Sequence, residues 1–367
     1  MLPVNAEEYI DMLKVSWQTK LPLMTYGAPG IGKSDIVRQV FPDIANSMNR
    51  KFAEWAHLTH DEKLECIKTP SKYFIMSDQR IGGMDSTDLR GLPKFSGDWI
   101  ETTPYSWVGY FTQIGAAGVI FLDEINLAPP TVAGQAYEII LSRTVGDRKI
   151  AADVLVLGAG NRATDRAFTF EMPMPLRDRF NEIELSPDVE TWTKWAAKSG
   201  INPHLISFVN WKEMYLYSLD KVKGSDKGST PRSICRASAL IGDGDISGNT
   251  TRKYITCSCG QAFAVEFQAY VKYYMELNWA QIFKKPEMVA GFSVDKCWAV
   301  SGGLVEKYRK DETLFDSLLD VISYMRKDFA IVSLKMICNA DAKKFAKSVG
   351  TSKNFSKLAK EYGKYLL

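Results

Sequence analysis

The sequence is poor in the features that define secreted and metal-rich proteins. Its 367 residues include only six cysteines, and Cys257 and Cys259 are the only two that lie close together. A Cys-x-Cys pair that has no second pair and no neighbouring histidine is a poor zinc site. The pattern therefore argues against a disulfide-rich or zinc-bound fold, and we expect reduced thiols of the kind found in the cytoplasm.

Long apolar runs and targeting segments are also lacking. No uninterrupted apolar run approaches the roughly 18 residues that a membrane-spanning helix needs. Residues 1–13 carry acidic side chains where a secretory signal would carry basic ones. The chain has no internal repeat and no long low-complexity tract. These absences predict a cytoplasmic protein with no membrane segment.

Charge is distributed unevenly along the chain. The net charge is +3, but residues 1–190 carry 19 Lys and Arg against 26 Asp and Glu, whereas residues 191–367 carry 27 against 17. A basic C-terminal part could bind nucleic acid or an acidic partner. The lysines from Lys335 to Lys364 are, however, interleaved with apolar residues, as on amphipathic helices. We therefore favour solvated helix faces over a nucleic-acid surface.

Short apolar runs alternate with helical patterns in the first half of the chain. The sequence predicts strands at residues 21–26, 73–76, 118–122, 153–157 and 181–185. It predicts helices at residues 6–19, 33–48, 104–114 and 130–142. This alternation is typical of a parallel sheet covered by helices on both faces. Because the strand signal then fades, we predict an α/β core at residues 1–187 and a helical part at residues 188–367.

A glycine-rich loop connects the predicted strand at residues 21–26 to the predicted helix at residues 33–48. Residues 27–34 read Gly-Ala-Pro-Gly-Ile-Gly-Lys-Ser, which is the P-loop or Walker A pattern between a predicted strand and a predicted helix. Glycines let backbone N–H groups surround phosphate oxygens, and a helix N-terminus favours the same anion. Lys33 is predicted to reach the β- and γ-phosphates, and Ser34 to bind Mg²⁺. The residues predicted to contact the nucleotide are Gly27, Pro29, Gly30, Ile31, Gly32, Lys33, Ser34 and Asp35.

Polar side chains follow two later apolar runs. Asp123 and Glu124 end the run Val-Ile-Phe-Leu as a Walker B pattern, and ligands of open α/β sheets bind at such strand ends. Asp123 is predicted to hold Mg²⁺ through water, and Glu124 to orient the attacking water. Asn161 follows another predicted strand, and its amide can contact the γ-phosphate or the water if the two strands are neighbours. An ordinary turn asparagine is the alternative.

The chain carries five motifs in this order: GAPGIGKS, VIFLDEIN, GAGN, PLRDRF and STPRS. Together they resemble the motifs of the MoxR-type branch of the AAA+ ATPases, a branch related to midasin, dynein and the magnesium-chelatase ATPase subunit. The resemblance covers about residues 4–240 and is looser beyond them. It implies an ATP hydrolase with ATP and Mg²⁺ as cofactors, and a P-loop parallel sheet followed by an all-α lid and C-terminal helices.

The resemblance also implies roles for individual residues. Asn161 matches sensor 1, and Arg232 matches sensor 2. Arg179 matches the arginine finger that reaches into the site of a neighbouring subunit, with Arg177 as the second candidate. Such a finger stabilises charge on the transferring phosphoryl group. A solvated surface arginine is the alternative at each of these arginine positions.

Local chemistry agrees with the position of Arg232. Thr230 is a natural N-cap and Pro231 is a natural first residue of a helix. Arg232 is therefore predicted to project from the first turn of a helix in the lid.

Two segments lie between the P-loop and the acid pair. Residues 81–103 resemble the hairpin insertion of this branch that faces the pore of the ring, so we expect contact with a client there. Residues 48–72 depart from the family pattern and look like an extra helical insertion that includes His57 and His60. Two histidines at this spacing could suggest a metal, but we favour surface histidines.

The combined interpretation is an oligomeric, ATP-driven remodelling motor or chaperone that acts on a protein client. The resemblance suggests a hexameric ring and a partner that carries a von Willebrand factor A domain. A nucleic-acid motor or loader is the first alternative, because related branches act on DNA and the C-terminal part is basic. A nucleotide-dependent assembly scaffold with little turnover is the second.

Overall fold

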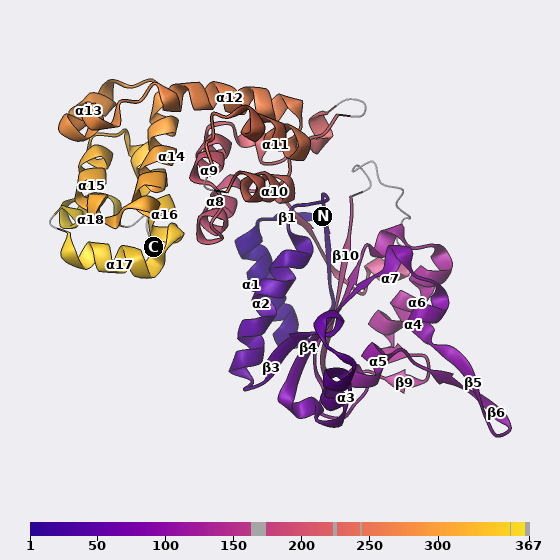
Figure 1. The fold of residues 1–367 in the computed structure, drawn as a ribbon. Coiled ribbons are helices and arrows are strands. Elements are labelled where there is room, and N and C mark those ends of the chain that lie inside the picture. The colour runs from indigo at the N-terminus through magenta and orange to yellow at the C-terminus, as the bar shows by residue number, and fades with distance from the viewer. Residues whose placement is uncertain (163–173, 223–225, 243, 353, 364–367) are drawn as a thin grey trace. The chain divides into compact units, whose positions relative to one another are not determined.

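The protein consists of two compact units, Met1–Ser186 and Pro187–Leu367. Their elements are shown in a computed structural model (Figure 1), which describes residues 1–162, 174–222, 226–242, 244–352 and 354–363. Among these residues, no helix combines the length and the apolar character that crossing a membrane requires.

The first unit is built on a seven-stranded sheet in which every neighbouring pair is parallel. In spatial order its strands are β1 (Leu2–Val4), β11 (Asn181–Leu185), β2 (Leu23–Gly27), β10 (Asp153–Gly160), β7 (Ala117–Asp123), β4 (Tyr73–Arg80) and β3 (Lys51–Glu54). The central strands β2, β7 and β10 are buried almost throughout, as continuous apolar runs in a parallel sheet require. The predicted α/β fold class is confirmed.

Helices cover both faces of this sheet (Figure 1). The rings of Trp17, Phe41 and Phe74 lie within 6.2 Å of one another and pack α1 and α2 against β4. Buried side chains of α5 and α6 pack with Ile120, Leu122 and Val156 on the other face. The helices of this unit are α1 (Ala6–Thr19), α2 (Lys33–Ser47), α3 (His60–Lys68), α4 (Ser86–Arg90), α5 (Ser106–Phe111), α6 (Pro130–Leu141) and α7 (Met174–Arg177).

The segment 48–72, predicted as a helical insertion, is only partly helical. It contributes the edge strand β3, which pairs with β4 from Lys51 opposite Tyr73, and then α3. The pattern missed β3 because an edge strand is only half buried and needs no continuous apolar run. His57 and His60 are exposed, and the described residues contain no cluster of metal ligands.

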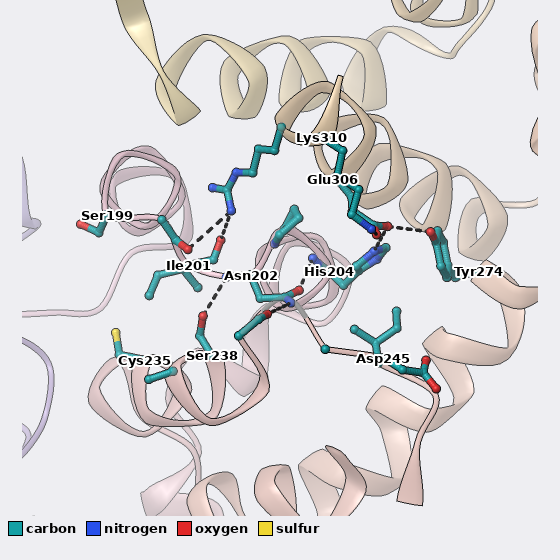
Figure 2. A pocket seen from close by; sticks show the side chains of 17 residues that line it. Ser199, Ile201, Asn202, His204, Cys235, Ser238, Asp245, Tyr274, Glu306 and Lys310 are labelled. Atoms are coloured by element: carbon teal, nitrogen blue, oxygen red, sulfur yellow. Dashed lines mark hydrogen bonds and ion pairs between the residues drawn. The ribbon is translucent and has the colours of Figure 1, made fainter. Parts of the chain in front are cut away.

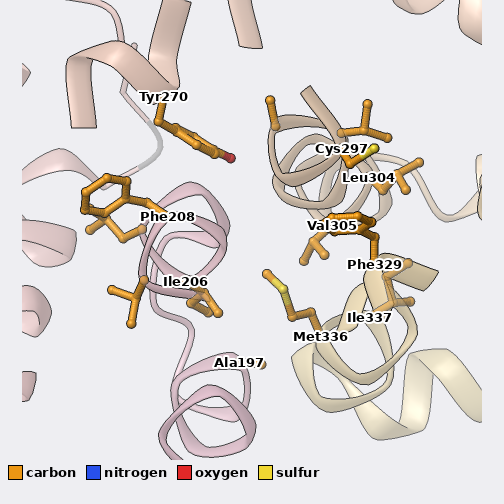
Figure 3. Close-up of a cluster of buried hydrophobic side chains, with 14 of the residues drawn as sticks. Ala197, Ile206, Phe208, Tyr270, Cys297, Leu304, Val305, Phe329, Met336 and Ile337 are labelled. Atoms are coloured by element: carbon orange, nitrogen blue, oxygen red, sulfur yellow. The ribbon is translucent and has the colours of Figure 1, made fainter. Parts of the chain in front are cut away.

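The described residues of the second unit form helices joined by loops and contain no strand. Its core includes Phe208, Tyr270, Leu304 and Met336, which are at most 1% exposed (Figure 3). The helices are α8 (Val189–Lys198), α9 (Pro203–Trp211), α10 (Pro231–Ile241), α11 (Asn249–Cys259), α12 (Gln261–Met275), α13 (Trp279–Lys284), α14 (Val294–Lys310), α15 (Phe315–Ser323), α16 (Lys327–Ala340), α17 (Ala342–Thr351) and α18 (Phe355–Tyr362).

A cavity of about 550 Å³ lies beside a polar network in this unit (Figure 2). The buried His204 contacts Glu306 through Nε2 at 2.9 Å and Tyr270 through Nδ1 at 3.1 Å. The Tyr274 hydroxyl donates to the same Glu306 oxygen at 2.6 Å, and Lys310 donates to the other oxygen at 2.5 Å. Burial lowers the pKa of His204, whereas the donated hydrogen bonds hold the pKa of Glu306 far below its usual range. A neutral histidine and an ionised carboxylate therefore pair here.

Candidate functional site

The P-loop connects β2 to α2 at the carboxyl edge of the sheet. A Cβ atom on Gly27 would lie 2.7 Å from Ile31 Cδ1 and 2.8 Å from the Leu185 carbonyl oxygen, so only glycine fits there. Gly30 and Gly32 have φ of 79° and 102°, values that L side chains rarely adopt. The first turn of α2 has no side-chain cap. Its N–H groups and helix dipole therefore suit an anion.

Lys33 is the first residue of α2, and it is only 8% exposed. Its Nζ atom donates to the carbonyl oxygens of Gly27 at 2.6 Å and Ala28 at 3.2 Å, and to Asn161 Oδ1 at 3.3 Å. A buried ammonium group needs such partners. These contacts place the Lys33 ammonium group within the P-loop and beside the end of β10.

Ser34 and Asp123 lie together, although 89 positions separate them in the sequence. The Ser34 hydroxyl donates to Asp123 Oδ2 at 2.8 Å. Glu124 follows with φ of 57°, a left-handed conformation that is uncommon for a residue with a side chain, and its N–H donates to Asp123 Oδ1 at 2.9 Å. Hydroxyl and carboxylate oxygens are the ligands that Mg²⁺ prefers, so this pair suits that ion.

Asn161 ends up beside the acid pair because β10 and β7 are neighbours in the sheet. A second asparagine, Asn126, holds it: Asn126 Nδ2 donates to the Asn161 carbonyl at 2.7 Å, and the Asn161 N–H donates to Asn126 Oδ1 at 3.1 Å. No role for Asn126 is predicted from the sequence. Only its position three residues after Asp123 could have drawn attention to it.

A group of charged residues next to Ser34 was also missed. Arg38, one turn after Ser34 on α2, pairs with Asp78 of β4, and it lies 3.2 Å from Glu54 and 3.6 Å from Asp35. Burial and the nearby Asp123 raise the pKa of Asp78, and Arg38 opposes them. Nothing in the sequence pairs Arg38 with β4, because 40 residues separate Arg38 from Asp78.

The remaining residues predicted to contact phosphate differ in their surroundings. Ile31 is 9% exposed and packs beneath the loop, close to the Gly27 Cα. Pro29 is half-buried. The Asp35 side chain is 60% exposed and faces Arg38, so a contact with phosphate would come from its backbone rather than from its carboxylate.

The two arginine-finger candidates have different environments. Arg177, the last residue of α7, makes a paired contact with Glu182: Nη2 to Oε2 is 2.8 Å and Nε to Oε1 is 3.0 Å. This contact fastens Arg177 to its own chain. Arg179 is exposed, and no described residue makes a hydrogen bond or ion pair with it.

The sensor 2 candidate lies in the second unit. α10 begins at Pro231, with Thr230 as its N-cap and Ser233 completing a capping box. Arg232 is in the first turn of this helix and is exposed.

An antiparallel hairpin projects from the body of the first unit (Figure 1). It is formed by β5 (Leu92–Ser96) and β6 (Trp99–Thr103). Three of its large apolar side chains are strongly exposed, namely Phe95 at 82%, Trp99 at 67% and Ile100 at 62%. Side chains of this kind rarely face water together unless they bind something.

Comparisons with known proteins bear on the first unit. Residues 23–188 match the family described as "ATPase family associated with various cellular activities (AAA)". No curated protein matches the sequence.

Solved structures resemble the chain only distantly. NtrX from Brucella abortus, in complex with ADP, is 12% identical with a TM-score of 0.35, covering 98% of this chain and 68% of that chain. The RuvB Holliday junction branch migration motor from Thermotoga maritima is 13% identical with a TM-score of 0.26, covering 83% of this chain and 76% of that chain. Likeness at this level carries no argument about function. The family match is a similarity of residues 23–188, which make up less than half of the chain.

Proposed function

We propose that the protein binds ATP with Mg²⁺ and hydrolyses it. The observation that carries this proposal is the meeting of three segments at one edge of the sheet, seen in the contacts from Lys33 to Asn161 and from Ser34 to Asp123. Together these segments bring the N–H groups of the loop and the Lys33 ammonium group close to three polar side chains. These are Ser34 and Asp123, whose oxygens can bind a metal, and the Asn161 amide. The AAA-family match over residues 23–188 supports the same reaction.

The residues of this edge have separate roles in the proposal. The amides ahead of Lys33 bind the phosphate oxygens, and Lys33 moves from the Gly27 and Ala28 carbonyls to the β- and γ-phosphates. Ser34 and Asp123 hold Mg²⁺, which when bound neutralises charge on the phosphates. Glu124 orients the attacking water, and Asn161 contacts either that water or the γ-phosphate.

The experiment that tests the proposal is a comparison of Glu124→Gln with the unchanged chain. The variant should bind ATP with similar affinity and should not release phosphate, because it lacks the carboxylate that polarises the water. Asp43→Asn is the matched control, since it removes an exposed carboxylate from α2 outside the site. Normal phosphate release by Glu124→Gln would remove Glu124 from the mechanism.

We further propose that the protein acts as a ring of identical subunits, as a MoxR-type hexamer does. Arg179 supports this assembly because it is exposed and has no partner among the described residues, as an arginine that completes a neighbouring site should be. An arginine finger contributes about 10³–10⁵ in rate. Arg232 would couple the state of the phosphates to movement of the lid.

The proposed substrate of this motor is a protein client, and the β5–β6 hairpin is its proposed contact. The exposed Phe95, Trp99 and Ile100 support this role, because aromatic and aliphatic side chains bind unfolded or extended protein segments through apolar contact. A partner with a von Willebrand factor A domain is part of the same proposal. Stimulation of hydrolysis by an unfolded protein, lost in a Phe95→Ser and Trp99→Ser double variant, is expected. Stimulation by single-stranded DNA instead, falling steeply with salt, would favour the nucleic-acid motor.

A further inference from the structure

Asp78 lies close to the proposed Mg²⁺ ligands but belongs to none of the predicted motifs. It is on β4, which pairs in parallel with β7, and its Cα partner is Phe121, two residues before Asp123. Alternate residues of a strand point to the same face of a sheet. Asp78 and Asp123 are therefore on the same face of neighbouring strands, which is the face that α2 covers.

The two oxygen atoms of the Asp78 carboxylate are in different situations. Oδ2 pairs with Nη2 of Arg38. Oδ1 is buried, and no described residue donates a hydrogen bond to it. The Asp78 side chain is only 12% exposed, so bulk water gives Oδ1 little compensation.

Arg38 accounts for one oxygen of this carboxylate but does not explain Oδ1. Its guanidinium also contacts Glu54 at 3.2 Å and lies 3.6 Å from Asp35. Arg38 therefore has other acceptors, and an ion pair alone needs only one oxygen of Asp78. The second oxygen is left as an acceptor without a donor among the described residues.

We propose that Asp78 is a positioning residue that accepts, through Oδ1, a hydrogen bond from a water molecule of the Mg²⁺ hydration shell. The inference rests on the proposed function, in which Ser34 and Asp123 hold that ion. Mg²⁺ in proteins keeps several water ligands, and each of them needs acceptors for its hydrogens. Residues that hold such outer ligands often change metal affinity by about 10–100-fold when replaced.

The test is a Mg²⁺ titration of nucleotide binding to the full chain, read by the fluorescence of a labelled ADP. In Asp78→Asn, the amide oxygen can still face Arg38, and the amide NH₂ then takes the place of Oδ1 and cannot accept a hydrogen bond. The Mg²⁺ concentration at half-saturation should rise about tenfold or more, while ADP affinity in EDTA stays unchanged. An Asp78→Asn half-saturation equal to that of the unchanged chain would overturn the proposal.

Glu54→Gln is the matched control, because it removes a different carboxylate contact of Arg38. It should leave the Mg²⁺ concentration at half-saturation unchanged. An equal rise in both variants would show that Arg38 alone matters and would overturn the role of Asp78.

A crystal structure of the unchanged chain with Mg²⁺ and ADP decides the same point if Asp78→Asn does not fold. A metal-bound water against Oδ1 supports the proposal, and a site without one contradicts it. Absence of any nucleotide binding by the unchanged chain would instead overturn the proposed function, and this inference with it.

Discussion

The two units of the protein differ in how their buried ionisable side chains are satisfied. In the second unit, His204, Glu306, Tyr274 and Lys310 satisfy one another, so that network is closed. In the first unit, Oδ1 of Asp78 is buried and has no partner among the described residues, whereas the buried partnerless atoms of the second unit, on Trp192, Trp279 and Ser333, belong to side chains that carry no charge. Polar groups left without partners cost folding free energy. The difference suggests that the first unit keeps an ionisable side chain for a ligand, whereas this polar network of the second unit holds its own helices.

The largest effect predicted for either unit is on the rate of ATP hydrolysis, and it is expected at Arg179 of the first unit. Arg179→Ala should lower the rate of ATP hydrolysis about 10³-fold or more and leave ATP affinity nearly unchanged. Arg177→Ala is the comparison, because Arg177 is held by Glu182. Mixing Arg179→Ala chains with Glu124→Gln chains should restore some turnover, and activity per chain should rise with protein concentration. Full activity of Arg179→Ala together with loss in Arg177→Ala would reverse the assignment.

The next effect concerns stability of the second unit alone. Leu304 of α14 is fully buried (Figure 3). Leu304→Ala should therefore lower the free energy of unfolding by about 2–5 kcal/mol. Val294→Ala, in the same helix at a side chain that is 45% exposed, should cost less than about 0.5 kcal/mol. Denaturant unfolding measures both. ADP affinity under native conditions should be the same in both variants, and its loss in Leu304→Ala would show that the site depends on the second unit.

A smaller effect is expected at Asn126, which the sequence did not single out. Asn126→Ala removes two hydrogen bonds that hold the Asn161 backbone, and this should cost about 1–3 kcal/mol of transition-state stabilisation, or roughly a ten- to hundredfold loss of kcat. ADP binding should change less than kcat. The exposed Asn46→Ala serves as the control. An unchanged kcat in Asn126→Ala would mean that Asn161 needs no such support.

The smallest effect is a pH dependence of the closed network. Folding lowers the pKa of both His204 and Glu306. A group whose folded pKa is depressed stabilises the fold above its unfolded pKa, and this contribution is lost as the pH falls. The free energy of unfolding should therefore decrease on acidification, first below about pH 6.5 for His204 and then below about pH 4.3 for Glu306. Glu306→Gln should remove the part of this dependence below about pH 4.3, and a variant that loses stability there as the unchanged chain does would contradict the assignment.

Sequence patterns predicted the first unit well where each element has a local signal. Apolar runs located the central strands, and the run at residues 181–185 coincides with β11 (Asn181–Leu185). The glycine spacing also located the loop between β2 and α2. The edge strand β3 was missed because it is short and half-exposed.

Contacts between distant segments could not be predicted in the same way. Asn126 and Asn161 are 35 residues apart, and Arg38 and Asp78 are 40 apart, and each pair meets only because of the order of strands in the sheet. That order, with β10 next to β7 and β7 next to β4, is a tertiary property that no local pattern encodes. In the second unit, helical periodicity indicated helices, but it gave no information about how His204 reaches Glu306, 102 residues away.

The central claim is that triphosphate oxygens bind against the backbone amides ahead of Lys33. Calorimetric titration of the full chain with a slowly hydrolysed ATP analogue and Mg²⁺ tests it most directly, with Lys33→Ala as the comparison. The account predicts one binding site per chain in the unchanged protein and no measurable binding in Lys33→Ala. Equal affinity in the two proteins would contradict it.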